Sequence, residues 1–133
     1  MKKQLIDKAF IAMNNAYAIY SNYHVGSCVL LKDGTTFLGA NIENASFGAT
    51  NCAERSAIYS AYSNGYRKED IQALAIVSDG YRIAAPCGIC RQVLSELIGQ
   101  DTPIYLSNGK EELETTIAEL LPMQFNKGDV KHD

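Results

Sequence analysis

The sequence predicts an α/β fold, a three-layer α-β-α sandwich built on one mixed sheet of about five strands. The order of the segments predicts it, because a helical stripe and a strand–turn–strand pattern are followed by alternating helical and strand-like segments. The composition agrees, since 47% of the 133 residues are hydrophobic and 20% are charged, as in globular domains. We therefore expect a single domain over 1–133, with a polar, frayed tail over 126–133.

The first part of the chain predicts a helix and a hairpin. Residues 4–17 predict an amphipathic helix, because their apolar side chains recur with the 3.6-residue period. Residues 25–32 and 35–40 predict two strands, joined at Asp33-Gly34 because glycine readily adopts a positive φ. A polar, glycine-containing loop follows over 41–51, and such loops often carry functional residues.

The second part alternates helices with strands. Residues 52–62 and 88–98 predict helices. The segment between them, 71–77, is almost wholly apolar, which is typical of a strand buried on both faces. A short strand over 103–106 and a short helix over 116–121 complete the expected elements.

Charge and hydropathy exclude several classes of protein. The chain has 12 Lys and Arg against 15 Asp and Glu, a net charge of −3 without a basic cluster, which argues against a nucleic-acid partner. No apolar run approaches the ~20 residues that cross a bilayer, so no membrane partner is expected. The N-terminus lacks the apolar stretch of a signal peptide, which favours a cytoplasmic location. In that reducing compartment the four cysteines are expected to be buried, metal-bound or catalytic.

Two cysteine motifs open the two central helices. Cys52-Ala53-Glu54-Arg55 begins one helix, and Pro86-Cys87-Gly88-Ile89-Cys90 begins the other. Cys87 and Cys90 are three residues apart and share one face of a first helical turn. If the two helix starts meet, three sulfurs converge where the helix dipoles favour thiolates, the form that binds metal.

Three thiolates suit Zn²⁺ and leave a fourth position for water, the pattern of a catalytic site, whereas a structural site has four protein ligands. Bound zinc lowers the pKa of water to about 7. Glu54 lies two residues beyond a ligand and can take that proton, and Arg55 can donate hydrogen bonds to a thiolate and offset its charge.

Each motif alone has a plainer interpretation. A lone C-x-x-C also fits a redox pair or a structural zinc site, and Cys52 alone fits a small buried apolar residue. Glu54 and Arg55 alone fit solvated helix positions. His24 and Cys28 are the candidates for a fourth, closing ligand, although both fall in or beside a strand and Cys28 is most simply part of the core.

The combination of motifs resembles the small zinc-dependent cytidine deaminases of pyrimidine salvage, the homotetrameric kind with three cysteine ligands. The resemblance runs almost end to end. It is carried by Ala16-Tyr17-Ala18, Tyr20-Ser21, Val25-Gly26, Asn41-Ile42-Glu43-Asn44-Ala45-Ser46, the two cysteine motifs with Arg91-Gln92, Glu119-Leu120-Leu121-Pro122 and Phe125. The segment from Asn41 to Asn44 narrows the resemblance to enzymes that act on free nucleosides.

The resemblance implies hydrolytic deamination of cytidine and 2′-deoxycytidine to the uracil nucleosides and ammonia. One Zn²⁺ per chain would be held by Cys52, Cys87 and Cys90. Glu54 would act as the proton shuttle, and Arg55 would donate hydrogen bonds to a thiolate ligand. The backbone N–H of Ala53 would meet the base O2.

The remaining site residues also come from the resemblance. Asn41 and Glu43 would hydrogen-bond the ribose 3′-hydroxyl, although the two types alone equally fit a solvated turn. Tyr23 stands where the family usually has Phe and would pack near the base. Phe125 would reach the base from a neighbouring subunit of the homotetramer; its plainer interpretation is an anchor in the protein's own core.

Departures from the family pattern concern the base pocket. Ile19 replaces a usual proline, and His24, Ser27 and Cys28 depart from the apolar or small residues common at their positions. None of them touches the predicted zinc ligands. Two alternatives stay open: a deaminase of another cytosine nucleoside such as blasticidin S, and a non-catalytic zinc or redox binding module.

Overall fold

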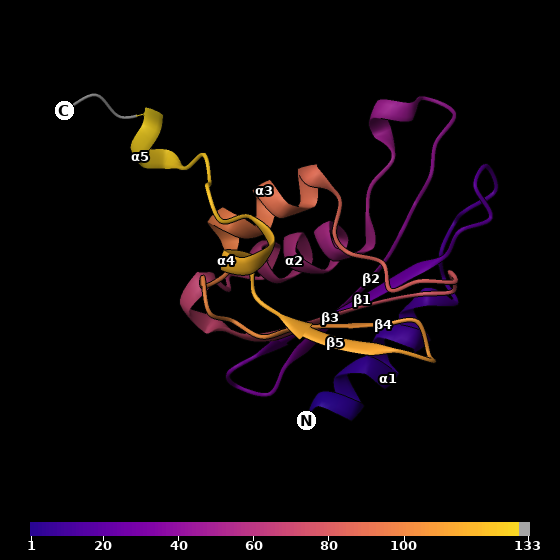
Figure 1. The fold of residues 1–133 in the computed structure, drawn as a ribbon, viewed down its shortest axis with the longest axis horizontal. Coiled ribbons are helices and arrows are strands. Elements are labelled where there is room, and N and C mark those ends of the chain that lie inside the picture. The colour runs from indigo at the N-terminus through magenta and orange to yellow at the C-terminus, as the bar shows by residue number, and fades with distance from the viewer. Residues whose placement is uncertain (131–133) are drawn as a thin grey trace.

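The computed structural model describes residues 1–130, and their centre is one mixed, five-stranded sheet (Figure 1). The strand order is β2-β1-β3-β4-β5. The pair β3 and β4 is parallel, and the other neighbouring pairs are antiparallel. The strands are β1 (Val25–Leu31), β2 (Thr36–Ala40), β3 (Ile71–Ser78), β4 (Ile104–Ser107) and β5 (Glu112–Thr115).

Helices cover both faces of the sheet, which confirms the expected three layers. They are α1 (Lys2–Met13), α2 (Ala53–Ser63), α3 (Gly88–Leu97), α4 (Ile117–Leu120) and α5 (Lys127–Val130), with 3-10 turns at Phe47–Ala49 and Lys68–Asp70. Helix α1 lies on one face, α2, α3 and α4 lie on the other, and α5 extends away from the sheet (Figure 1). Within residues 1–130, no helix combines the length and the apolar character that spanning a membrane requires.

Strand β3 supplies both layers of the core, as its apolar sequence predicts. Leu74 and Ile76 pack with α2 and α3 on one face, and Ala73, Ala75 and Val77 pack against α1 on the other. Burial of each large aliphatic side chain stabilises the fold by about 1.5–3 kcal/mol. The small residues on the α1 side leave room for that helix.

Glycines let both neighbouring helices lie directly on the β1–β2 hairpin. A Cβ on Gly26 would stand 2.0 Å from the Ala9 carbonyl oxygen in α1, and one on Gly39 would stand 2.3 Å from the Ala53 carbonyl oxygen in α2. Only a residue without a side chain permits these contacts. The start of α2 is therefore held directly against β2. The hairpin turn is as expected, with φ +91° at Gly34.

Three segments differ from the sequence-based expectation. The first helix ends at Met13 and does not extend to residue 17, because Tyr17 pairs with the segment after β2: its N–H bonds the Asn41 carbonyl at 2.9 Å, and its carbonyl accepts from Glu43 N at 2.8 Å. Strand β5 was not expected. Residues 127–130 form one exposed helical turn, and 131–133 lie outside the described residues.

The loops that carry the predicted site residues lie at one end of the central strands, where β1 begins and β2 and β3 end. Val25, which begins β1, pairs with Ser78, which ends β3, and Gly26 pairs with Ala40, which ends β2. From this end of the strands, loop 41–52 leads to α2 and loop 79–87 leads to α3. The topology therefore delivers the starts of both helices to the same place.

Candidate active site

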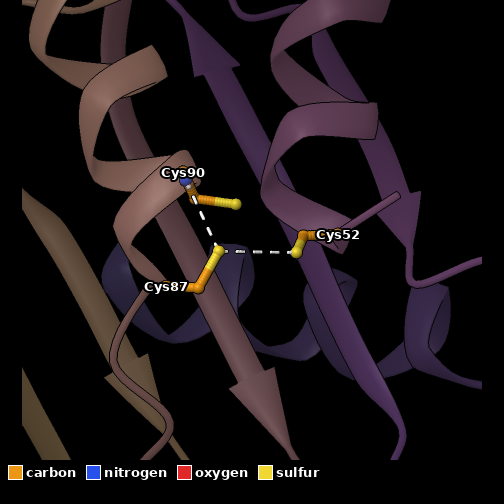
Figure 2. A group of neighbouring side chains, drawn as sticks. All are labelled: Cys52, Cys87 and Cys90. Atoms are coloured by element: carbon orange, nitrogen blue, oxygen red, sulfur yellow. Dashed lines mark hydrogen bonds between the residues drawn. The ribbon is translucent and has the colours of Figure 1, made fainter. Parts of the chain in front are cut away.

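Three cysteine sulfurs converge where α2 and α3 begin (Figure 2). Cys52 precedes the first residue of α2, Cys87 precedes that of α3, and Cys90 lies in the first turn of α3. The Cys52 and Cys87 sulfurs are 3.7 Å apart, and all three lie within 4.8 Å of one another. The two helix starts therefore meet, which is the condition under which the sequence predicts that the three sulfurs converge.

The donor set of this cluster fits zinc. Three thiols are soft ligands, and their mutual distances allow one ion to reach them all. Among the described residues no fourth protein ligand joins them. Cys28 is buried in the core on the α1 side, and His24 is bonded to Asp79. The arrangement therefore leaves one coordination position for water, as a catalytic zinc site requires.

The cluster favours a negative charge on Cys52. A hydrogen bond from the Cys90 thiol, together with the nearby Arg55 guanidinium, lowers the pKa of Cys52 to about 5. Arg55 donates from its Nη2 atom to the Cys52 sulfur at 3.4 Å. Its Nε–H is buried and has no hydrogen-bond partner among residues 1–130. Arg55 thus sits against a thiolate, where it offsets part of the negative charge of a three-thiolate site.

Glu54 is a buried carboxyl beside the sulfurs. Its side chain is only 4% exposed, although glutamate is rarely buried without a partner. Burial raises its pKa to about 7, and the charge of Cys52 adds to the rise, while a hydrogen bond from Cys90 opposes it. Such a carboxyl can both accept and donate a proton near neutral pH. The preceding residue, Ala53, is fully buried, and its N–H lies in the first helical turn, where no intrahelical acceptor exists.

The predicted ribose ligands Asn41 and Glu43 fasten the segment that precedes β1. Asn41 accepts from Val25 N at 2.9 Å through Oδ1 and donates from Nδ2 to the Tyr23 carbonyl at 2.8 Å. Glu43 accepts from the N–H groups of Tyr20 and Ser21 at 3.0 and 3.1 Å and from the Ser21 hydroxyl. The Ser21 hydrogen bond is the main cause that lowers the pKa of Glu43 and keeps it ionised.

The two predicted aromatic residues are both accessible. Tyr23 is 38% exposed, and an added Cβ on Gly80 would stand 2.8 Å from its ring. Phe125 is 61% exposed, so the interpretation as an anchor in the protein's own core is wrong. Its backbone carbonyl accepts from Gln92 Nε2 at 2.8 Å, which leaves the ring free for a neighbouring molecule.

Sequence reasoning missed two side-chain groups that join the loops around the site. Arg91 donates to the carbonyl of Pro86 at 2.7 Å and to that of Leu120 at 2.9 Å, so it holds the approach to Cys87. Arg91 directly follows Cys90 in the second cysteine motif, and this position was the one sequence signal for its role. His24 and Asp79 form the other group, and their separation by 55 residues gives no local pattern to read.

Three thiols and a buried glutamate meet at the starts of two helices on this α-β-α fold, an arrangement that fits a catalytic zinc site with an acid–base carboxyl. Comparison with known families agrees with this class. Residues 1–106 match the family described as "Cytidine and deoxycytidylate deaminase zinc-binding region". The chain belongs to this family.

Individual relatives cover nearly the whole chain. A cytidine deaminase of Halalkalibacterium halodurans is 48% identical over 130 residues, which are 97% of each chain. The crystal structure of a cytidine deaminase from Burkholderia pseudomallei matches with a TM-score of 0.90 and 41% identity, covering 94% of this chain and 99% of the other. A blasticidin-S deaminase of Bacillus cereus is more distant, at 29% identity over 137 residues, covering 96% of each chain.

Proposed function

We propose that this chain is a zinc-dependent cytidine deaminase, which hydrolyses cytidine and 2′-deoxycytidine to uridine and 2′-deoxyuridine with release of ammonia. One observation carries the proposal: the sulfurs of Cys52, Cys87 and Cys90 converge beside the buried carboxyl of Glu54. The relative from H. halodurans supports the choice of cytidine. We take residues 1–133 as one deaminase domain.

Glu54 moves the protons of the reaction. When bound to the three cysteines, a zinc ion polarises a water molecule and makes it a strong nucleophile. Glu54 accepts the proton of the water that adds at C4 of the base and delivers it to N3. Glu54 then takes the remaining proton of the new C4 hydroxyl and delivers it to the amino group as the C4=O bond forms and the C4–N bond breaks, so one water is consumed and one ammonia is released. Burial keeps the carboxyl away from bulk water, which would compete for its proton.

The groups around Glu54 hold the nucleoside. The N–H of Ala53 points from the start of α2 and donates to the base O2. Asn41 uses one of its two amide hydrogens on the Tyr23 carbonyl, so the second is available for the ribose 3′-hydroxyl, which Glu43 also contacts. Tyr23 forms a wall beside the base.

We further propose that the chain assembles as a homotetramer in which neighbouring subunits complete each site. Supporting this assembly, several large apolar side chains are exposed, with Phe47 at 89%, Met123 at 93% and Phe125 at 61%. Association of subunits would remove such apolar surface from water, which is favourable. Phe125 would enter the site of a neighbouring subunit.

The proposed setting is pyrimidine salvage in the cytoplasm. None of the four cysteines is in a disulfide, which fits a reducing compartment. The net charge of −3 argues against a nucleic acid as the substrate and fits a small, uncharged nucleoside.

The test follows the loss of cytosine ultraviolet absorbance on mixing the purified protein with cytidine, with bound zinc assayed in the same sample. We expect turnover with about one zinc per chain. Glu54→Gln should keep the zinc and lose about 10²–10⁴-fold in kcat, because it removes the proton shuttle and conserves the side-chain volume. Glu96→Gln, on the exposed part of α3, is the matched control and should keep full activity. A zinc-loaded protein that leaves cytidine unchanged would refute the proposal.

Blasticidin S is the alternative substrate, and the B. cereus relative is the observation that favours it. The same assay with blasticidin S decides between them. A kcat/KM for blasticidin S above that for cytidine would assign the site to the antibiotic.

A further inference from the structure

His24 and Asp79 form a double contact that the proposed reaction does not use. The Nδ1 atom of His24 lies 2.6 Å from Oδ2 of Asp79, and the backbone N–H of His24 donates to Oδ1 at 3.0 Å. The backbone N–H of Asp79 returns a bond to the His24 carbonyl at 3.2 Å. Both side chains are about two-thirds buried, at 34% and 39% exposure. Hydrogen bonds to a carboxylate are stronger than neutral ones, so this contact fixes its two segments.

The two segments joined by this contact also meet at Tyr23 and Gly80. Tyr23 precedes His24, and Gly80 follows Asp79. The Tyr23 ring lies so close to Gly80 that a Cβ there would be 2.8 Å from its Cε1 atom. Each residue of the pair is adjacent to one partner of the ring contact, so the pair, together with the pairing of Val25 with Ser78, holds the ring close to the glycine.

Other groups hold the metal ligands independently of this pair. Arg91 fastens Pro86, next to Cys87, and Cys52 begins a helix that lies on β2. Asn41 still anchors the backbone of Tyr23 through its carbonyl, so loss of the His24–Asp79 contact would shift the Tyr23 ring relative to Gly80 and leave the sulfur cluster in place.

We propose that His24 and Asp79 are positioning residues that hold the Tyr23 ring against Gly80 and so fix one wall of the base pocket. The inference rests on the proposed function, since it concerns the binding of the cytosine ring. It predicts a specific kinetic signature: the pair affects ground-state and transition-state binding equally, so its loss raises KM and leaves kcat nearly unchanged.

The test compares three variants with the wild-type holoenzyme. His24→Leu and Asp79→Ala should raise KM for cytidine by up to about tenfold, the change expected if the whole free energy of one hydrogen bond to a charged group is lost from substrate binding. His24→Asn should restore most of the wild-type KM, because its amide nitrogen occupies the place of Nδ1 and can still donate. Zinc content should stay at the wild-type value in all three.

Asp33→Ala is the matched control. Asp33 makes the same kind of double contact, with Thr35 N at 2.9 Å and the Tyr66 hydroxyl at 2.7 Å, at the other end of β1. Asp33→Ala should lower the thermal midpoint about as much as His24→Leu and Asp79→Ala do, and it should leave KM for cytidine unchanged. This control separates general destabilisation from positioning.

Gly80→Ala tests the ring contact without removing a hydrogen bond. The added methyl group would displace the Tyr23 ring and raise KM in the wild-type background, and it should have no further effect in the Tyr23→Ala background.

Wild-type KM values in His24→Leu, Asp79→Ala and Gly80→Ala would overturn the inference while the proposed function stood. A fall in kcat together with lost zinc would also overturn it, because the pair would then serve the metal ligands. A wild-type holoenzyme inactive on cytidine would remove the proposed function and this inference with it.

Discussion

The contact between Gly39 and α2 makes the geometry of the metal site sensitive to one methyl group. In Gly39→Ala the new Cβ would stand 2.3 Å from the Ala53 carbonyl oxygen and 2.6 Å from Ala57 N. Non-bonded contacts to carbon begin near 3.4 Å, so α2 must move by about 1 Å to accommodate it. Both contacts are to backbone, so rotation of a side chain does not relieve them.

That displacement is large compared with the tolerance of the site. Zinc–ligand distances vary by only about 0.2 Å around their preferred values, and Cys52 and Glu54 both move with α2. A misplacement of about 1 Å in an active site reduces the rate by about 10²-fold. We therefore expect Gly39→Ala to lower kcat/KM by about 10²-fold and to weaken zinc binding, in addition to an overpacking cost of about 1–3 kcal/mol in stability.

Gly26→Ala is the matched comparison. Its Cβ would meet α1 even more closely, at 2.0 Å from the Ala9 carbonyl oxygen, but α1 carries no predicted site residue. The assay combines kcat/KM for cytidine, zinc per chain and the thermal midpoint of both variants. Gly26→Ala should lose stability and keep its zinc and its kcat. Full activity and zinc in Gly39→Ala, or equal losses of zinc in both variants, would refute the reasoning.

Three further predictions concern the metal and the neighbouring subunit. Arg55→Gln should reduce zinc affinity or the rate by about 10–100-fold, because it removes the guanidinium that lies 3.4 Å from the Cys52 sulfur; zinc titration and kcat measure this, and no change in either would contradict it. Removal of zinc with a chelator should abolish turnover and lower the thermal midpoint, and added Zn²⁺ should restore both; full turnover in demonstrably zinc-free protein would contradict it. Phe125→Ala should raise KM, and mixing it with Glu54→Gln subunits should recover some activity through hybrid sites; a dilute, monomeric and fully active wild-type sample would contradict a shared site.

The elements with strong local patterns were predictable, and the edge strand was not. β3 was recognisable because seven of its eight residues are buried, which leaves an almost continuous apolar sequence. β5 has the sequence Glu-Leu-Glu-Thr, and only Thr115 in it is buried. Its place in the sheet depends on backbone bonds to β4, which no local pattern records. The first helix was predicted too long because the pairing of Tyr17 with the distant residues Asn41 and Glu43 overrides local propensity.

The candidate metal ligands were predictable because helix starts carry a local signature and the thiol spacing places two sulfurs on one face. The convergence of Cys52 with Cys87 needed the fold, since the two are 35 residues apart. The double use of Asn41 in holding the Tyr23 segment was not predictable, because an amide in a polar loop fits many roles. The roles of Ala53, Asn41, Glu43, Tyr23 and Phe125 toward substrate stay predictions.

The end of the central strands away from the site, where β1 turns into β2, is more open than the end that carries the site. The β1–β2 turn at Gly34 and the turn after α2 at Gly65 both have positive φ, and nothing lies within 4 Å of an added Cβ at either glycine. The Tyr66 hydroxyl joins these turns through Asp33. A peptide tag or a fluorescent label inserted at the tip of either turn would thus be separated from the chemistry by the length of the sheet. The fold in this way separates an end where a displacement of one helix alters the metal site from an end where an insertion meets no neighbouring atoms.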